Sequence, residues 1–100
     1  MKTILTITGS DSTGGSGLQA DIRTISALGG QAVSAVTSIT MQNTLGIQAF
    51  YDLPPEIVRG QIEAVINDFQ PEIVKVGMVR NVGILAAIVA TLTKYRPRYI

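Results

Sequence analysis

A glycine-rich segment near the start of the chain, GSDSTGGSG over residues 9–17, has the residue types best suited to ligand chemistry. An apolar, β-branched run over residues 3–8 precedes it and apolar residues at helical spacing follow it, which predicts a strand, a loop and a helix. In open α/β proteins, the backbone amides and the positive helix terminus at such a loop bind small polar or anionic ligands. We therefore expect a ligand site at this loop.

The loop departs from both common phosphate-binding motifs. Residues 9–14 match the start of a P-loop, but Gly15 stands where that motif needs lysine. The spacing over residues 15–20 formally matches the dinucleotide fingerprint, yet Ser38 and Thr40 occupy the region of its acidic partner. A plain strand-to-helix connection with flexible glycines is the remaining interpretation.

Asp21 is a carboxylate on the apolar face of the helix predicted after the loop. At about 100° per residue, it falls within the arc formed by Leu18, Ile22, Ile25 and Leu28. The residues expected to point away are Gln19, Arg23 and Ser26. An unpaired buried carboxylate costs several kcal/mol, so Asp21 must meet donors from the loop, another side chain or a ligand. An internal staple and a ligand contact both stay open, whereas Asp11 is expected to form a local Asx turn.

Gln42 is the second polar residue of interest. If the strand that ends near Thr40 keeps a two-residue period, Ser38, Thr40 and Gln42 share a face at its carboxyl end. A glutamine amide offers a donor and an acceptor side by side, which match the ring nitrogen and exocyclic amine of an aminopyrimidine. The alternative is a flap residue that faces water. Met78 either lines the same pocket or fills the core, and no role follows for Lys75.

Strand and helix signals alternate along the chain. Strands are predicted over 3–8, 32–40 and 72–77, and a short β-like piece over 47–51 forms a hairpin or a flap. Helices are predicted over 18–28, 55–69 and 81–95, the last with an apolar face of Val82, Leu85, Val89 and Leu92. The alternation favours a parallel sheet with right-handed crossovers. Residues 97–100 look like the start of another strand, so we expect a chain that stops within a fold.

The composition bounds the class of protein. One hundred residues make one domain at most, and 46% hydrophobic against 15% charged residues suit buried strands covered by helices. Eight basic and seven acidic residues give a charge of +1 without a basic stripe, so no nucleic-acid partner is expected. Because the chain lacks cysteine and histidine, any metal needs oxygen ligands. We recognise no signal peptide and no membrane span, and therefore expect a cytoplasmic protein without a membrane partner.

Four segments together carry a resemblance to a known family. They are TITGSDSTGGSGLQAD over 6–21, SALG over 26–29, QNTLG over 42–46 and VKVGM over 74–78. In order and spacing they resemble the amino-terminal half of hydroxymethylpyrimidine/phosphomethylpyrimidine kinases, which are thiamine-biosynthesis enzymes of the ribokinase-like superfamily. The resemblance implies a three-layer α/β fold with a mainly parallel sheet. Residues 1–100 would form the substrate-binding, amino-terminal part of a single kinase domain.

The resemblance also implies a substrate site. Gly9, Asp21, Gln42 and Met78 match family positions that line the pocket for hydroxymethylpyrimidine. No catalytic residue and no metal ligand is expected in this chain, because the family carries its catalytic Asp or Cys and its ATP and Mg²⁺ sites in the carboxyl-terminal half. The chain alone is therefore expected to be inactive.

The implied reaction transfers the γ-phosphoryl group of ATP to the hydroxymethyl group of 4-amino-5-hydroxymethyl-2-methylpyrimidine, and then to the monophosphate. A pyridoxal kinase of the same superfamily is the alternative within the enzyme class. A ligand-binding module without catalysis is the alternative outside it. The family is commonly dimeric, which makes a homodimer an expectation too.

Overall fold

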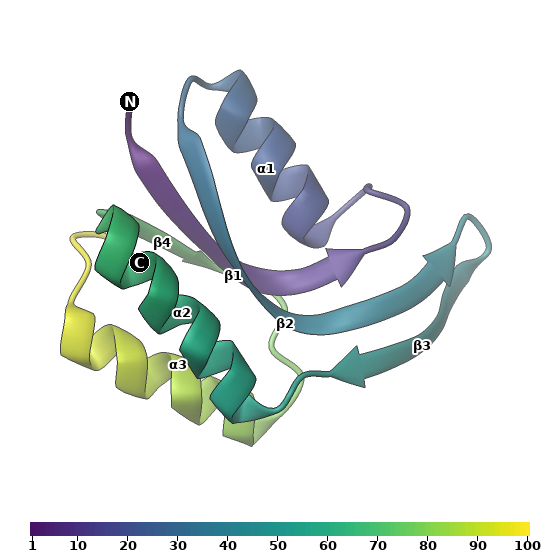
Figure 1. Ribbon diagram of the computed structural model, residues 1–100. Coiled ribbons are helices and arrows are strands. Elements are labelled where there is room, and N and C mark those ends of the chain that lie inside the picture. Colours follow the sequence, from purple (N-terminus) through teal and green to yellow (C-terminus); the bar gives the residue numbers. More distant parts are fainter.

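The computed structural model describes residues 1–100 in full. The elements in chain order are β1 (Thr3–Asp11), α1 (Gly17–Ala27), β2 (Gln31–Asn43), β3 (Gly46–Asp52), α2 (Pro55–Phe69), β4 (Ile73–Val76) and α3 (Val82–Tyr95). They form one four-stranded sheet in the order β3-β2-β1-β4, in which β1 is parallel to β2 and β4, and β3 is antiparallel to β2. Helix α1 covers one face of the sheet, and α2 and α3 cover the other (Figure 1). This confirms the predicted three-layer arrangement with a mainly parallel sheet.

Strand β1 separates an apolar core from a polar face of the sheet. Leu5 and Ile7 are fully buried and belong to the core between the sheet and helices α2 and α3. The other core residues are Ala35, Val58, Ile62, Ile66, Val74, Ile84, Ile88 and Leu92. Thr6 and Thr8 alternate with the core residues of β1 and are also buried, so their hydroxyl groups need hydrogen-bond partners on the opposite face. These partners position the site described below.

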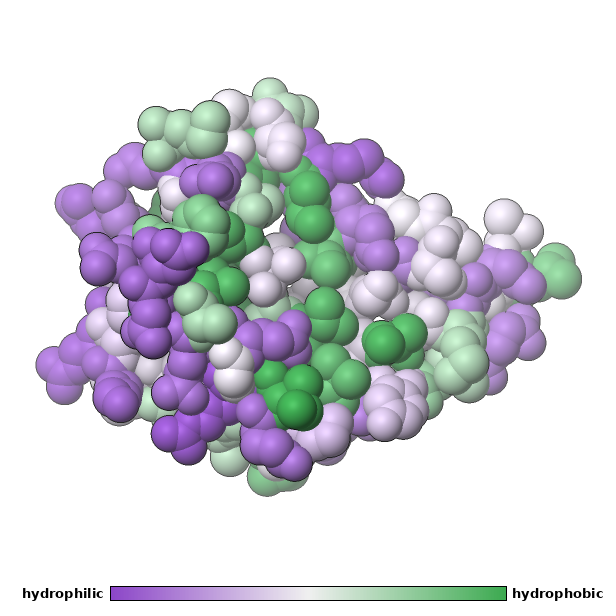
Figure 2. Space-filling model, in the orientation of Figure 1, coloured by the Kyte–Doolittle hydropathy of each residue, from purple (hydrophilic) through white to green (hydrophobic).

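Strands β2 and β3 form a hairpin that projects from the sheet (Figure 1). The backbone N–H of Leu45 donates to Asn43 Oδ1 at 2.9 Å, and Gly46 has a φ of 133°, a conformation that favours glycine. The segment over 47–51 is therefore a hairpin strand. Its apolar side chains are largely exposed, and its projecting end carries both hydrophobic and hydrophilic residues (Figure 2).

Helix α1 buries fewer apolar residues than its periodicity predicts. Ile25 is buried, but Ile22 is 38% exposed and Leu28, which lies beyond the end of the helix, is 83% exposed. The prediction of one buried arc was wrong for these two residues. The reason is that α1 packs on the face of β1 that carries Thr6 and Thr8, where polar contacts replace an apolar surface.

Helix α3 also differs from the prediction, although its bounds agree. It buries Ile84, Ile88 and Leu92, whereas three residues of the predicted face are exposed, namely Val82, Leu85 and Val89. Apolar residues occupy most sides of this helix, so periodicity could not select a face. Contact with α2 and the sheet selects it instead.

The predicted strand start over residues 97–100 corresponds to one parallel bridge beside β4. Tyr99 pairs with Ile73, and the backbone N–H of Val74 donates to the carbonyl of Tyr99 at 2.9 Å.

None of the three helices has the length and apolar character that crossing a membrane requires.

Candidate functional site

A pocket of about 270 Å³ lies where β1 and β4 end and the β2–β3 hairpin begins to project. Its lining residues are Thr8, Gly9, Ser10, Asp11, Ser16, Gly17, Thr40, Gln42, Ile47, Lys75, Gly77 and Met78. Three of the four predicted site residues, Gly9, Gln42 and Met78, therefore meet in one pocket although they come from distant segments. Asp21 is not among the lining residues, but its ion-pair partner Lys75 is. Carboxyl ends of parallel strands are the usual place for ligands in such folds.

Asp11 organises the glycine-rich loop. Its Oδ1 accepts from the backbone N–H of Thr13 at 2.9 Å, and its Oδ2 accepts from the backbone N–H of Ser16 at 2.8 Å. Both hydroxyl groups of these residues donate to the same carboxylate. The backbone N–H of Thr13 is the main reason that the pKa of Asp11 falls to about 2, although burial acts in the opposite direction. The expected Asx turn is confirmed, and these two amides hold the chain's own carboxylate and not an external anion.

The folded pKa of Asp11 predicts a pH-dependent stability. This pKa lies below the ordinary value of 3.8 for an aspartate, so ionisation of Asp11 stabilises the folded state. The stabilisation is fully present above pH 3.8 and declines as the pH falls toward 2. We expect Asp11→Asn to lower the melting temperature at pH 7, and the gap to wild type to narrow between pH 4 and pH 2. Asp68→Asn, on the exposed surface of α2, is the control. A gap that stays constant with pH would contradict the role of the carboxylate charge.

Helix α1 begins in close contact with the end of β1. Gly17 has a φ of 60°, and a Cβ added there would collide with the carbonyl oxygen of Gly9. Gln19 closes the same junction, because its Oε1 accepts from the backbone N–H of Asp11 at 2.8 Å and its Nε2 contacts Ser10 Oγ at 2.8 Å. The prediction that Gln19 points away was wrong, since a long side chain in the first turn lies back over the preceding residues. Arg23 also turns to the loop and donates to the carbonyl of Gly14.

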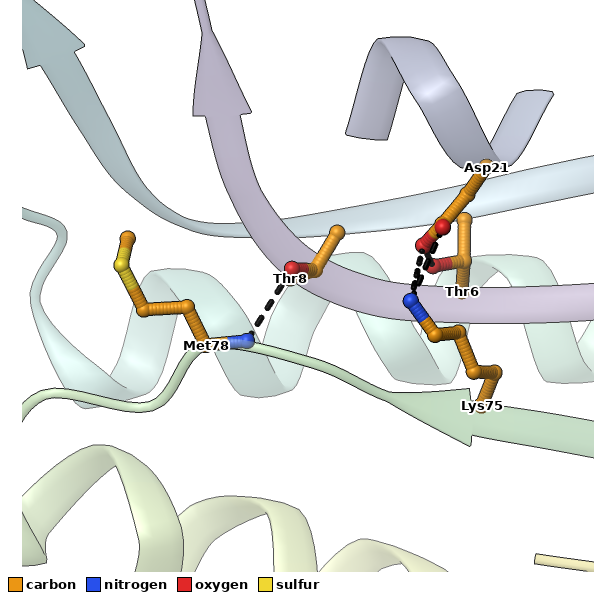
Figure 3. Close-up of polar contacts among 5 residues, drawn as sticks. All are labelled: Thr6, Thr8, Asp21, Lys75 and Met78. Atoms are coloured by element: carbon orange, nitrogen blue, oxygen red, sulfur yellow. Dashed lines mark hydrogen bonds and ion pairs between the residues drawn. The ribbon is translucent and has the colours of Figure 1, made fainter. Parts of the chain in front are cut away.

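Asp21 joins three elements of the fold (Figure 3). Its Oδ2 accepts from the hydroxyl of Thr6 on β1 at 2.6 Å, and Lys75 Nζ on β4 lies 2.8 Å from both carboxylate oxygens. The Asp21 side chain is 15% exposed and that of Lys75 is 52% exposed. The structure thus shows the internal staple, while a ligand contact of Asp21 stays a prediction. It also gives Lys75 a role that the sequence did not reveal, because the partner is distant along the chain.

The staple leads to a prediction for Asp21. We expect Asp21→Asn to reduce the free energy of unfolding by about 1 kcal/mol. The substitution weakens the hydrogen bond from the buried Thr6 hydroxyl and removes the charge that pairs with Lys75. Because Lys75 is half exposed, the loss of the ion pair contributes only a small share of this change. Asp21→Leu should cost about 1–3 kcal/mol, since it leaves the Thr6 hydroxyl without a partner. Urea unfolding of the ligand-free, full-length protein measures both. Unchanged midpoints in both variants would rule out the staple.

Met78 forms one wall of the pocket, and its backbone is fixed on both sides. Its N–H donates to Thr8 Oγ1 at 3.1 Å (Figure 3), and its carbonyl accepts from the hydroxyl of Thr37 at 2.8 Å. The methyl end of its side chain occupies the space that a Cβ at Gly9 would need. Thr8 and Thr37 were not predicted as site residues. The sequence alone does not distinguish a buried strand threonine that positions a pocket residue from one that only packs in the core.

Gln42 lies on the opposite wall, at a bulge between β2 and β3. Its Oε1 is 2.9 Å from the hydroxyl of Thr40, and no group of the chain bonds to its Nε2. The Thr40 hydroxyl also contacts the carbonyl of Ser10 at 2.7 Å, and with a single hydrogen it donates to only one of the two. Ser12 Oγ bonds to both the N–H and the carbonyl of Gln42, which ties the hairpin to the glycine-rich loop. The amide therefore offers a free donor and a partly engaged acceptor to the pocket.

The fold matches solved vitamin kinases over nearly all of its length. A phosphomethylpyrimidine kinase from Clostridium difficile superposes with a TM-score of 0.95 at 49% identity, covering 99% of this chain and 43% of that one. A pyridoxal kinase from Bacillus subtilis, solved as an ADP complex, superposes with a TM-score of 0.89 at 29% identity, covering 98% and 38%. These matches and the pocket define the amino-terminal part of a ribokinase-like α/β fold.

The sequence comparisons identify the family within that class. The phosphomethylpyrimidine kinase family matches residues 11–100, and the chain belongs to this family. A hydroxymethylpyrimidine/phosphomethylpyrimidine kinase from Mycobacterium leprae is 49% identical over 88% of this chain, and a thiamine biosynthesis bifunctional protein, ThiED, from Geobacter sulfurreducens is 42% identical over 97%. The matched region is 32% of the first relative and 20% of the second, so the chain spans a third or less of their length.

Proposed function

We propose that the protein carrying this chain transfers the γ-phosphoryl group of ATP to the hydroxymethyl oxygen of 4-amino-5-hydroxymethyl-2-methylpyrimidine, and then to the monophosphate. Residues 1–100 contribute the pyrimidine-binding side of this kinase domain. The observation that carries the proposal is the meeting of Gly9, Gln42 and Met78 in one pocket. Family membership supports the same reaction class.

The pocket suits a flat, polar ring. The thioether of Met78 provides a soft apolar wall for an aromatic ring, and the bare backbone of Gly9 leaves the space in which the methyl end of Met78 lies. The free Nε2 of Gln42 can donate to a ring nitrogen, and its Oε1 can accept from the neighbouring exocyclic amine. These groups bind and orient the ring, so that the hydroxymethyl group faces the reacting phosphate.

Asp21 belongs to the proposed substrate site through Lys75. Lys75 lines the pocket and is the only cation that does so, and its Nζ bonds to both oxygens of Asp21. Oδ1 accepts only from Lys75, whereas Oδ2 also accepts from Thr6. Oδ1 therefore keeps a lone pair for a donor of the substrate.

ATP and a divalent metal are the cofactors that kinases of this family imply. Residues 1–100 bring no group of three or more acidic side chains together that could hold a metal ion by protein ligands alone. Asp11, the one carboxylate that lines the pocket, is already held by four donors. We place the ATP site, the metal site and the catalytic residue outside these residues, and propose no catalytic role for any side chain within them.

The remaining expectations concern the setting of the enzyme. We propose a cytoplasmic homodimer that acts on a small molecule and binds neither nucleic acid nor membrane. The balanced charge and the absence of cysteine support this setting, and the exposed apolar side chains of the hairpin, such as Leu45 and Ile47, support self-association.

A product assay on the full-length protein tests the proposed function. With ATP and Mg²⁺, the pyrimidine should give a monophosphate and then a diphosphate, detected by mass spectrometry. The fold similarity to the Bacillus subtilis pyridoxal kinase makes pyridoxal the competing substrate. Faster phosphorylation of pyridoxal, or binding of the pyrimidine without any turnover, would overturn the assignment.

A further inference from the structure

Arg80 links strand β3 to the connection after β4, and these two strands are the opposite edges of the sheet. It follows Met78 by two residues, in the connection between β4 and α3. Its Nε lies 3.0 Å from Asp52 Oδ1 at the end of β3, and its guanidinium carbon lies 3.7 Å from the centre of the Phe50 ring. Since the strand order is β3-β2-β1-β4, this side chain joins segments that make no direct strand contact.

The Asp52 carboxylate extends this link into β2. The hydroxyl of Ser38, which is fully buried, donates to the same Oδ1 at 2.6 Å. Strands β2 and β3 and the connection after β4 therefore converge on one carboxylate. Gln42 and Ile47, which form the hairpin wall of the pocket, pair with each other at the far end of the same β2–β3 ladder.

The Arg80–Asp52 pair is less exposed than the Lys2–Glu72 and Arg59–Glu63 pairs. The Arg80 side chain is 33% exposed and that of Asp52 is 29% exposed, compared with 56% and 43% for Arg59 and Glu63. Exposed pairs contribute little to stability, whereas a guanidinium that both pairs with a carboxylate and stacks on an aromatic ring is held in one orientation. Lysine could replace the charge but not the planar stacking group.

We propose that Arg80 is a positioning residue, which holds the hairpin wall at a fixed distance from the Met78 wall and thereby sets the affinity of the pocket for its ring ligand. The proposal rests on the proposed function, since the ligand is taken to be the pyrimidine. Arg80 does not line the pocket. It acts through Phe50 and Asp52 on the hairpin and through the short connection to Met78.

Two readouts on the full-length protein test this role. Arg80→Met should speed amide hydrogen exchange in β3 without ligand and raise the KM for the pyrimidine about tenfold, with the KM for ATP changed less than about twofold. Arg80→Lys should give an intermediate KM. Asp52→Asn should act like Arg80→Met, and the double variant should be little worse than either single variant. Arg59→Met, which removes an exposed ion pair on α2, is the matched control.

The outcomes separate this proposal from the proposed function. Exchange in β3 no faster in Arg80→Met than in Arg59→Met would overturn the positioning role, whatever the substrate. Faster exchange with an unchanged pyrimidine KM would show a merely structural link and also overturn it. If the wild type phosphorylated no pyrimidine, the proposed function would fail, and the hydrogen exchange would still support or overturn the coupling of Arg80 to the hairpin.

Discussion

Gly77→Ala is expected to reduce the free energy of unfolding by about 1–3 kcal/mol, although the substitution adds one methyl group. A Cβ at Gly77 would collide with both Oγ1 and Cβ of Thr8. Thr8 is 2% exposed on the central strand, so it has little room to move. Its Oγ1 also accepts the backbone N–H of Met78, and the collision therefore displaces the pocket wall as well. Urea unfolding of the full-length protein measures the change.

Gly60→Ala is the matched control, because it makes the same substitution where there is space. Gly60 lies inside α2, and no heavy atom outside its own helix lies within 4 Å of a Cβ added there. Alanine in an exposed helix interior is favoured over glycine by about 0.5–1 kcal/mol. The two substitutions should thus have opposite signs. Equal stability of Gly77→Ala and wild type would show that β1 and β4 are not packed as described.

Gln42→Leu is expected to weaken binding of the pyrimidine by about 1–3 kcal/mol, or roughly 5- to 150-fold, since it keeps the volume and deletes both polar contacts. Pyridoxal presents a phenolic oxygen and no amine beside its ring nitrogen, so its affinity should change less. The fold should tolerate the change, because Thr40 retains the carbonyl of Ser10 as a partner.

Gln48→Leu is the control for this substitution. It lies on the same hairpin, is exposed and makes no side-chain hydrogen bond within the chain. Calorimetric titration of both variants with both ligands measures the effect. Equal losses for the pyrimidine and pyridoxal, or no loss for either, would mean that Gln42 is a packing or flap residue.

The elements of this fold could be predicted from local patterns, because each is marked by its own residues. Pro55 and Glu56 mark the start of α2, and glycines follow α1 and β4. The buried face of α3 could not be predicted, since apolar residues surround the helix and contact with α2 and the sheet decides which of them are buried. The partial exposure of α1 has a related cause, because its partner surface on β1 is polar.

The candidate site was predictable only in part. The residues that the sequence analysis did not identify were missed for one physical reason. Gly9, Gln42 and Met78 stand at strand ends, where position in the sequence already indicates the ligand side of a parallel sheet. Lys75 and Arg80 form ion pairs with partners more than 25 residues away along the chain, Asp21 and Asp52 respectively. Such pairs are created by the strand order β3-β2-β1-β4, which no local pattern contains.

The most direct test of the central claim, that this pocket binds an aminopyrimidine, is a calorimetric titration of the full-length wild-type protein with 4-amino-5-hydroxymethyl-2-methylpyrimidine, with pyridoxal as the reference ligand. Binding of the pyrimidine at one site per chain, with a lower Kd than pyridoxal, is the expected result. Absence of pyrimidine binding, or a lower Kd for pyridoxal, would contradict it.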